Sequence, residues 1–378
     1  MSRMSAILRP DEGSPEPRRL VPLLLDWFVK DARDLPWRRA LDPYAIWVSE
    51  VMLQQTQVKT VLPFWERWMR ELPDIAAAAG AHPEQLHKLW EGLGYYTRVR
   101  NLQKAAQQIM QHHGGRFPES FDDILALPGI GRYTAGAISS IAFNRPTPIV
   151  DGNVVRVLTR LFGIGGDPGE KRISDRLWQI AETLVLDASR CSGRARACSH
   201  LNQSLMELGA LVCTPQAPLC FSCPVKAYCA ALQEDRVALL PNLPKRAKPT
   251  VLHFAAFAAE WDGKWLVRQR PSGGVNAHLW EFPNVEIPAG MDPASAATSA
   301  LGFSPETLRP LCRISHAITR YRITLTVFAC DTTQSPEAGF GQGLWLTGGE
   351  LQALSFPSAH KKILKQLPES GSARFFET

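Results

Sequence analysis

Residues Leu127 to Arg160 read LPGIGRYTAGAISSIAFNRPTPIVDGNVVRVLTR, and the rest of the chain is organised around this stretch. It opens with a glycine-bracketed turn at 128–131, followed by a predicted helix of small residues over 133–142. A second helix is predicted to begin at Asp151. Gly129 and Gly131 allow a close backbone approach and leave N–H groups free at a helix N-terminus, which suits a phosphate. The same turn also fits an ordinary helix–helix connection, so its meaning depends on the rest of the chain.

Length and composition set the broad class of the protein. The 378 residues exceed one typical domain, so we expect two. A hydrophobic content of 45% and a charged content of 21% fit a soluble globular protein, and a net charge of +6 permits nucleic-acid binding without requiring it. No apolar run reaches the ~18–20 residues that span a membrane. Residues 1–17 are polar and lack a signal peptide, so we expect a disordered lead and a cytoplasmic, nucleoid-associated protein.

Four of the eight cysteines are crowded together. Cys213, Cys220, Cys223 and Cys229 follow the spacing Cys-x6-Cys-x2-Cys-x5-Cys. Four thiolates on one loop can hold either Zn²⁺ or an iron–sulfur cluster. Zinc sites usually combine two close pairs and this loop has one, so the spacing favours a 4Fe–4S cluster, with disulfides a poor third.

Hydrophobic periodicity divides the chain into a helical part and a mixed part. The predicted helices of the first part cover 18–30, 44–70 with Pro63 as a break or start, short stretches within 74–113, 173–188 and 200–212. A proline-rich, basic linker is predicted over 235–250. The predicted strands that follow it cover 253–260, 264–270 and 323–330, with a closing helix over 358–366. The sequence therefore predicts an all-α domain over 18–234 and an α+β domain over 251–368.

Two carboxylates suggest acid-assisted chemistry. Glu50 lies in an apolar helix, where burial would raise its pKa, and Asp151 stands at a helix start, where it would stay ionised. Such a pair suits glycosidic-bond hydrolysis, in which one acid protonates a leaving group and the other stabilises an oxocarbenium ion. The plainer alternatives are a surface glutamate and a helix N-cap.

Residues 30–232 resemble the helix–hairpin–helix DNA glycosylase superfamily, and within it the MutY-type adenine DNA glycosylases. The matching motifs are 33–38 (RDLPWR), 47–58 (WVSEVMLQQTQV), 92–96 (GLGYY), 127–131 (LPGIG), 150–154 (VDGNV), 202–203 (NQ), 206–209 (MELG) and the four-cysteine loop. Because several independent motifs occur in the right order, the resemblance is specific.

This resemblance implies a role for each matching position. Glu50 matches the general acid that protonates the flipped adenine at N7, and Asp151 matches the acid that stabilises the sugar cation at C1′. Tyr133 and Asn153 match polar groups that assist at the same centre. The residues that match the lining of the adenine pocket are Arg33, Leu35, Trp37, Arg38, Val58 and Glu207. Those that match DNA-binding or intercalating positions are Gln55, Tyr96 (chosen over Tyr95), Gly129 and Gly131. The four cysteines match ligands of a 4Fe–4S cluster.

Tyr133 discriminates within the superfamily. The related endonuclease III type carries a lysine nucleophile just after the hairpin, where this chain has tyrosine. A tyrosine cannot form a Schiff base, so we expect base removal without strand cleavage.

The C-terminal part resembles the MutT-like, Nudix-fold domain of the same family, through 268–271 (RQRP) and 279–283 (LWEFP). A working Nudix hydrolase needs a glutamate-rich helix, and 284–304 offers only Glu286, so metal-dependent pyrophosphate hydrolysis is not expected. The resemblance implies an 8-oxoguanine recognition domain, with Ser315 and His316 matching a loop that usually reads Phe-Ser-His. Ile314 departs from that pattern.

The sequence thus predicts a monofunctional DNA glycosylase of base-excision repair, a hydrolase that removes adenine mispaired with 8-oxoguanine or guanine. The implied partner is double-stranded DNA carrying such a mispair, with no membrane and a monomeric protein. The alternatives are a bifunctional endonuclease III-type pyrimidine-lesion glycosylase, a non-catalytic iron–sulfur DNA-binding protein and a nucleotide pyrophosphatase. Cys191 and Cys198 have only His200 as a further nearby ligand, so we predict no second metal there.

Overall fold

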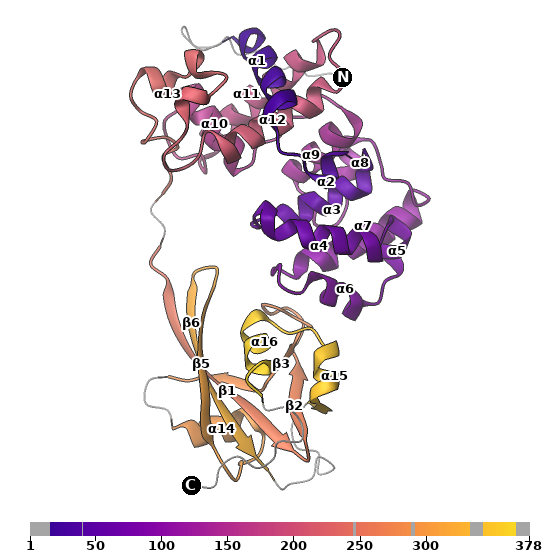
Figure 1. Cartoon of the computed structure of the whole chain (residues 1–378), viewed down its shortest axis with the longest axis vertical. Coiled ribbons are helices and arrows are strands. Elements are labelled where there is room, and N and C mark those ends of the chain that lie inside the picture. The colour runs from indigo at the N-terminus through magenta and orange to yellow at the C-terminus, as the bar shows by residue number, and fades with distance from the viewer. Residues whose placement is uncertain (1–15, 40, 245–246, 289–291, 333–342, 368–378) are drawn as a thin grey trace. The chain divides into compact units, whose positions relative to one another are not determined.

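A computed structural model describes residues 16–39, 41–244, 247–288, 292–332 and 343–367. They form two compact units (Figure 1), the first made of the described residues within 1–79 and 101–245 and the second of those within 80–100 and 246–378. The division at 245/246 falls within the predicted linker. Most of the predicted lead at 1–17 lies outside the described residues.

The first unit is helical throughout its described part. Its longer helices are α1 (Pro17–Asp31), α3 (Pro43–Leu53), α4 (Val58–Glu71), α7 (Thr97–His112), α9 (Arg132–Phe143), α10 (Gly152–Leu161), α11 (Lys171–Ser189) and α12 (Ala197–Leu211), of which the first turn of α7 belongs to the second unit. Its shorter ones are α2 (Pro36–Arg39), α5 (Ile75–Gly80), α8 (Phe121–Leu125), α13 (Ala230–Gln233) and the 3₁₀ turns η1 (Cys220–Ser222) and η2 (Lys226–Tyr228). One apolar core joins α1, α10, α11 and α12. No helix among the described residues is long and apolar enough to cross a membrane.

The prediction for 44–70 is wrong about where the helix breaks. The break lies at Gln54–Gln57, and Pro63, which was predicted as a break or start, lies inside α4. Gln54 has left the helical conformation with ψ 112°, and Gln55 is left-handed with φ 58°. The break separates α3, whose residues Tyr44–Met52 are all buried, from the amphipathic α4. It exposes a row of amide side chains at the end of a buried helix.

Small residues in α9 allow close packing, as the sequence suggested. A Cβ atom at Gly136 would lie 2.4 Å from the Pro148 carbonyl oxygen, which only glycine avoids. α9 therefore passes against the connection that leads to Asp151.

The second unit is built on a sheet of seven strands among its described residues, in the order β3-β2-β1-β6-β5, with β4 paired to β1 and β7 to β2. The strands are β1 (Thr250–Trp261), β2 (Lys264–Gln269), β3 (Trp280–Glu281), β4 (Asn284–Glu286), β5 (Arg309–Ile318), β6 (Tyr321–Asp331) and β7 (Leu344–Thr347). Its helices are α6 (Pro83–Trp90), α14 (Pro293–Leu301), α15 (Gly348–Ala353) and α16 (Ser358–Leu364).

Alternation along β1 gives this sheet two covered faces. Ala256 and Ala258 pack with α15 and α16, whereas Ala255 and Phe257 pack with α14. Both faces are covered because the central strand is apolar on both sides. The predicted α+β domain is confirmed.

Candidate active site

The sequence-predicted catalytic and pocket residues meet in one cavity of the first unit, with a volume of about 680 Å³. The eleven predicted residues in its lining are Arg33, Leu35, Trp37, Arg38, Glu50, Gln55, Val58, Tyr133, Asp151, Asn153 and Glu207. The volume lies in the range of ~300–1,000 Å³ typical of ligand pockets. The cavity is large enough for a base drawn out of a duplex.

Glu50 is buried, with 5% of its surface exposed, at the C-terminal half of α3. The Tyr133 hydroxyl donates to Glu50 Oε2 over 2.8 Å. Burial raises the pKa of Glu50 to about 7, the nearby negative charge of Asp151 adds to the rise, and the Tyr133 bond and the Arg38 charge oppose it. At neutral pH this carboxyl is therefore available in its protonated, proton-donating form.

Asp151 is the N-cap of α10, where its Oδ1 accepts from the Val154 N–H over 2.7 Å and its Oδ2 from Asn153 Nδ2 over 3.0 Å. Burial raises the pKa of Asp151, while those hydrogen bonds and the Arg156 charge lower it. The N-cap alternative and the catalytic prediction are therefore compatible, because the Asp151 carboxylate caps α10 and also lines the cavity.

A hydrogen-bond chain runs from Asp151 toward the cysteine loop. Asn153 Oδ1 accepts from Arg156 over 2.8 Å, and Arg156 also donates to the carbonyl oxygens of Gly209 and Cys213 over 2.7 Å each. Gly209 is required there because a Cβ atom would lie 2.7 Å from Asn153 Cβ. Sequence reasoning missed Arg156, which has no motif of its own.

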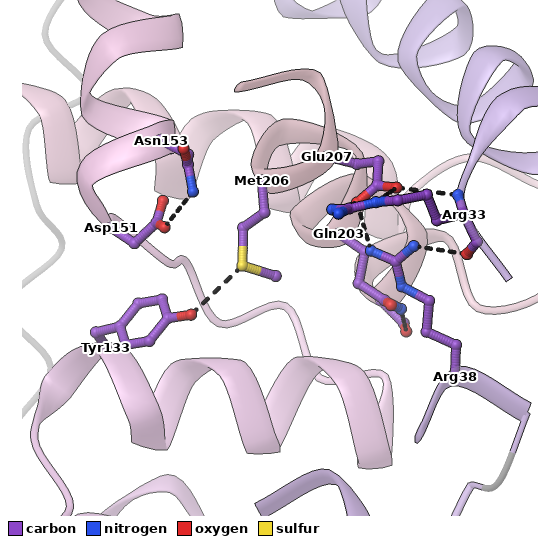
Figure 2. A network of polar contacts seen from close by, with 9 residues as sticks. Arg33, Arg38, Tyr133, Asp151, Asn153, Gln203, Met206 and Glu207 are labelled. Carbon is purple, nitrogen blue, oxygen red and sulfur yellow. Dashed lines mark hydrogen bonds and ion pairs between the residues drawn. The ribbon is translucent and has the colours of Figure 1, made fainter. Parts of the chain in front are cut away.

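The other end of the cavity holds an ion triad. Glu207 is 1% exposed and binds Arg33 through Nε and Nη2, over 2.7 Å each, and Arg38 Nη2 over 2.9 Å. Burial acts to raise the pKa of Glu207, but the hydrogen bonds from Arg33 and Arg38 outweigh it and lower the pKa to about 2. Figure 2 shows both guanidinium groups gathered around this carboxylate.

Sequence reasoning also missed two neighbours of the triad on α12. The Met206 sulfur lies 3.4 Å from the Tyr133 hydroxyl, and Gln203, which is 6% exposed, lines the same cavity (Figure 2). Helical spacing from Glu207 on α12 was an available signal for Gln203, because residues four apart share a face, whereas Met206 is adjacent to Glu207 and has no such signal.

The hairpin turn before α9 is shaped by its glycines. Gly129 has φ 77° and lies so close to Asn101 that a Cβ atom would approach Asn101 Cβ to 2.6 Å. Gly131 is the N-cap of α9 with open space beside it. The turn therefore leaves the first N–H groups of α9 free for an anion.

The four cysteines of the loop line a second, separate pocket of the first unit, together with Val212, Leu232 and Val237. Arg160 donates to Cys213 Sγ over 3.5 Å. Among the described residues, no three Cys, His, Asp or Glu side chains are placed to hold one metal ion. A zinc ion needs its four thiolates converging on one point, whereas a cluster takes each thiolate on a different iron.

The second unit holds the remaining predicted residues. Tyr96 is 5% exposed and packs edge-to-face on His87, whereas Tyr95 is 47% exposed with φ 48°. This burial conflicts with the choice of Tyr96 as the intercalating residue, because a ring that enters a base stack has to be accessible. Ser315 and His316 lie within β5, not in a loop as predicted.

Comparison with known proteins agrees with these features. Residues 48–183 match the model of the HhH-GPD superfamily base excision DNA repair proteins, and residues 255–366 match the NUDIX domain. The chain is 37% identical to the adenine DNA glycosylase of Rattus norvegicus, covering 92% of this chain and 77% of that protein. It is 40% identical to that of Buchnera aphidicola, covering 69% of this chain and 73% of that protein.

Among solved structures, that of a thermostable thymine-DNA glycosylase is similar, with a TM-score of 0.51 and 30% identity, covering 58% of this chain and 97% of that one. The helical fold of the first unit is therefore that of the base excision glycosylases. Since the match to the Rattus norvegicus protein extends over 92% of this chain, the chain belongs to the adenine DNA glycosylase family of base excision DNA repair enzymes.

Proposed function

We propose that the chain is a monofunctional glycosylase that hydrolyses the N-glycosidic bond of adenine mispaired with 8-oxoguanine or guanine in double-stranded DNA. The observation that carries this proposal is the buried, hydrogen-bonded Glu50 near Asp151 in a cavity large enough for a flipped base. Membership of the adenine DNA glycosylase family supports adenine as the excised base.

The two carboxyl groups have different roles in the proposed reaction. Glu50, protonated near neutral pH because burial raises its pKa to about 7, delivers a proton to N7 of adenine and turns the base into a better leaving group. Asp151 in its ionised form stabilises the positive charge that develops at C1′, held in place by Asn153 and the α10 N-terminus. Tyr133 keeps Glu50 oriented and, lacking an amine, forms no Schiff base with the sugar.

The pocket walls select the flipped base. Glu207 with Arg33 and Arg38 supplies hydrogen-bonding groups at one end of the cavity, while Leu35, Trp37 and Val58 supply apolar surface. A flipped base is recognised by hydrogen bonds to its edge and by stacking against apolar side chains.

The DNA contacts we propose are a phosphate at the Gly129–Gly131 hairpin and a side chain in the base stack from Gln55. Tyr95 replaces our sequence-based choice of Tyr96 as the aromatic wedge because its ring is exposed. Unstacking a base costs a few kcal/mol, and an inserted aromatic ring offsets part of that cost.

The C-terminal sheet domain recognises 8-oxoguanine in this proposal. Ser315 and His316 lie on adjacent positions of β5 and so face opposite sides of the strand. The Nudix-type helix position is occupied by α14, PASAATSAL, which carries no acid. A metal-bound pyrophosphatase site is therefore not supported.

We propose that Cys213, Cys220, Cys223 and Cys229 hold a 4Fe–4S cluster. Their pocket fits such a group, because its apolar walls exclude water and the cations of Arg160 and Lys226 line it to offset the negative charge of thiolate ligands. When bound, the cluster would serve as a structural tie for the loop over 213–229, in addition to its short 3₁₀ turns and the hydrogen bonds that Arg156 and Arg160 donate to carbonyl oxygens at 213–215.

The test is incubation of the protein with a duplex that carries adenine opposite 8-oxoguanine, with and without subsequent alkali. We expect strand scission only after alkali, a slower reaction on adenine opposite guanine, and none on adenine opposite thymine. Nicking before alkali, with a product trapped by borohydride, would mean that the enzyme uses an amine nucleophile and is not monofunctional.

A further inference from the structure

Glu91 carries a carboxylate at a position where a negative charge is unfavourable. It is the C-cap of α6, where the helix dipole disfavours negative charge, and its side chain is only 6% exposed. A buried charge is costly unless it is paired and hydrogen-bonded. The partners of Glu91 therefore show what it does.

Lys88 of α6 itself pairs with Glu91 Oε2 over 3.5 Å, and the other partners come from the far end of the chain but from the same compact unit. Phe356 N–H donates to Glu91 Oε1 over 3.2 Å, and the Lys361 ammonium group pairs with Glu91 Oε2. Phe356 is itself buried beneath the sheet, and Lys361 lies in α16. One carboxylate thus fastens both the start and the body of the closing helix.

Two further cations strengthen the same attachment. Lys88 Nζ donates to the carbonyl oxygens of Gln352 and Leu354 over 2.7 and 3.0 Å, at the C-terminal end of α15. Arg100 donates to the Ala277 carbonyl oxygen over 3.1 Å. The segment 80–100 therefore binds the sheet domain at two separate places, around residues 352–361 and at residue 277.

The turn that carries Tyr95 follows Glu91 directly, and it is held stiffly. The Arg98 guanidinium donates to the carbonyl oxygens of Leu93 and Gly94 over 3.0 and 3.1 Å. The same group lies over the rings of Trp90 and Tyr95, at 5.3 and 5.8 Å from their centroids. Because these contacts join the exposed Tyr95 ring to the turn that follows Glu91, we expect a displacement of Glu91 to shift that ring.

We propose that Glu91 is a positioning residue that fixes the Tyr95 turn to the 8-oxoguanine-reading domain and thereby contributes to the preference for 8-oxoguanine over guanine. This inference rests on the function proposed above. The sheet domain then recognises the base opposite adenine while the Tyr95 ring enters the base stack at a fixed position relative to that domain. Glu91 touches neither adenine nor the reacting bond.

The experiment uses full-length protein and compares Glu91→Ala, Lys361→Met and the double variant with two matched controls. Glu84→Ala removes an exposed acid from the same helix α6, and Lys365→Met removes an exposed lysine next to α16. Two quantities are measured for each: the ratio of single-turnover excision rates on adenine opposite 8-oxoguanine and opposite guanine, and backbone hydrogen exchange in peptides covering 92–96 and 356–361.

We expect Glu91→Ala and Lys361→Met each to lower the rate ratio, Glu91→Ala by about fivefold. The double variant should match Glu91→Ala, because both substitutions break the same Glu91–Lys361 ion pair. Exchange should rise in both peptides, and the controls should resemble the wild type. An equal fall in both rates, or an unchanged ratio, overturns the specificity role, and unchanged exchange in Glu91→Ala overturns the attachment. A wild-type enzyme without any preference for 8-oxoguanine refutes the proposed opposite-base recognition, and the exchange data still decide whether Glu91 fastens the turn.

Discussion

Replacing Glu50 by glutamine separates its catalytic role from its structural cost. The substitution keeps the shape of the side chain and an oxygen that accepts from the Tyr133 hydroxyl. It removes the proton that we assign to N7 of adenine. Loss of a general acid typically costs about 10²–10⁴ in rate, so we expect Glu50→Gln to abolish turnover on the adenine:8-oxoguanine duplex while binding to that duplex survives.

The same substitution should stabilise the fold at alkaline pH. The pKa of Glu50 is raised from 4.5 to about 7 in the folded state, so the folded protein binds a proton that the unfolded chain releases. Between those two values the wild type therefore loses stability as the pH rises, by roughly 3 kcal/mol in total. Glutamine does not titrate. The gain in free energy of unfolding for Glu50→Gln should thus be near zero at about pH 4.5 and largest above about pH 7.

Three measurements check this reasoning. Urea unfolding of both proteins at pH 5 and pH 8 gives the difference in stability, single-turnover excision gives the rate, and fluorescence anisotropy with a labelled duplex gives binding. The wild-type rate should also decline above about pH 7 as Glu50 loses its proton. A glutamine variant that excises adenine near the wild-type rate, or whose stability gain is the same at both pH values, would refute the assignment of Glu50 as a buried general acid.

Three further changes follow from the site. Arg156→Met breaks the hydrogen-bond chain to Asn153 and should lower the single-turnover rate by about tenfold or more, whereas Arg145→Met, which removes an exposed guanidinium, should leave it unchanged. Tyr95→Ala should weaken binding to the mispaired duplex by about 1–3 kcal/mol in an anisotropy titration, and an unchanged affinity would remove Tyr95 from the base stack. Glu207→Gln leaves the partly exposed guanidinium groups of Arg33 and Arg38 without their buried carboxylate and should lower the free energy of unfolding by about 2 kcal/mol at pH 7. That difference should shrink as the pH falls from 5 toward the pKa of Glu207 near 2.

Much of the site could be predicted because its motifs are local. The stretch around Glu50, the turn at Gly129 and the start of α10 each fix a backbone conformation within a few residues, and a family resemblance then orders them. Their meeting in one cavity depends on packing between helices distant in sequence, such as α3 against α9. The hydrophobic periodicity of a sequence does not reveal which distant helices pack against each other.

Other features were out of reach for physical reasons. The break between α3 and α4 looked like an effect of Pro63, yet the conformations of Gln54 and Gln55 produce it, and neither residue is a strong breaker in isolation. Tyr95 and Tyr96 are chemically identical neighbours, so only the fold distinguishes the exposed ring from the buried one. The attachment of residues 80–100 to the closing helix joins positions more than 250 apart along the chain.

The two buried glutamates of the cavity show how one fold gives one residue type two opposite protonation states. Burial pushes both pKa values upward. Glu207 receives hydrogen bonds from two guanidinium groups and stays ionised, with its pKa lowered to about 2. Glu50 is buried, accepts from the neutral Tyr133 hydroxyl and has the negative Asp151 nearby, so its pKa rises to about 7. Arg38 acts on both carboxyl groups: it donates to Glu207, and its charge lowers the pKa of Glu50, but burial of Glu50 and the Asp151 charge outweigh that effect. We therefore attribute the proton on Glu50 to its burial and to the charge of Asp151, and the ionised state of Glu207 to its two arginines.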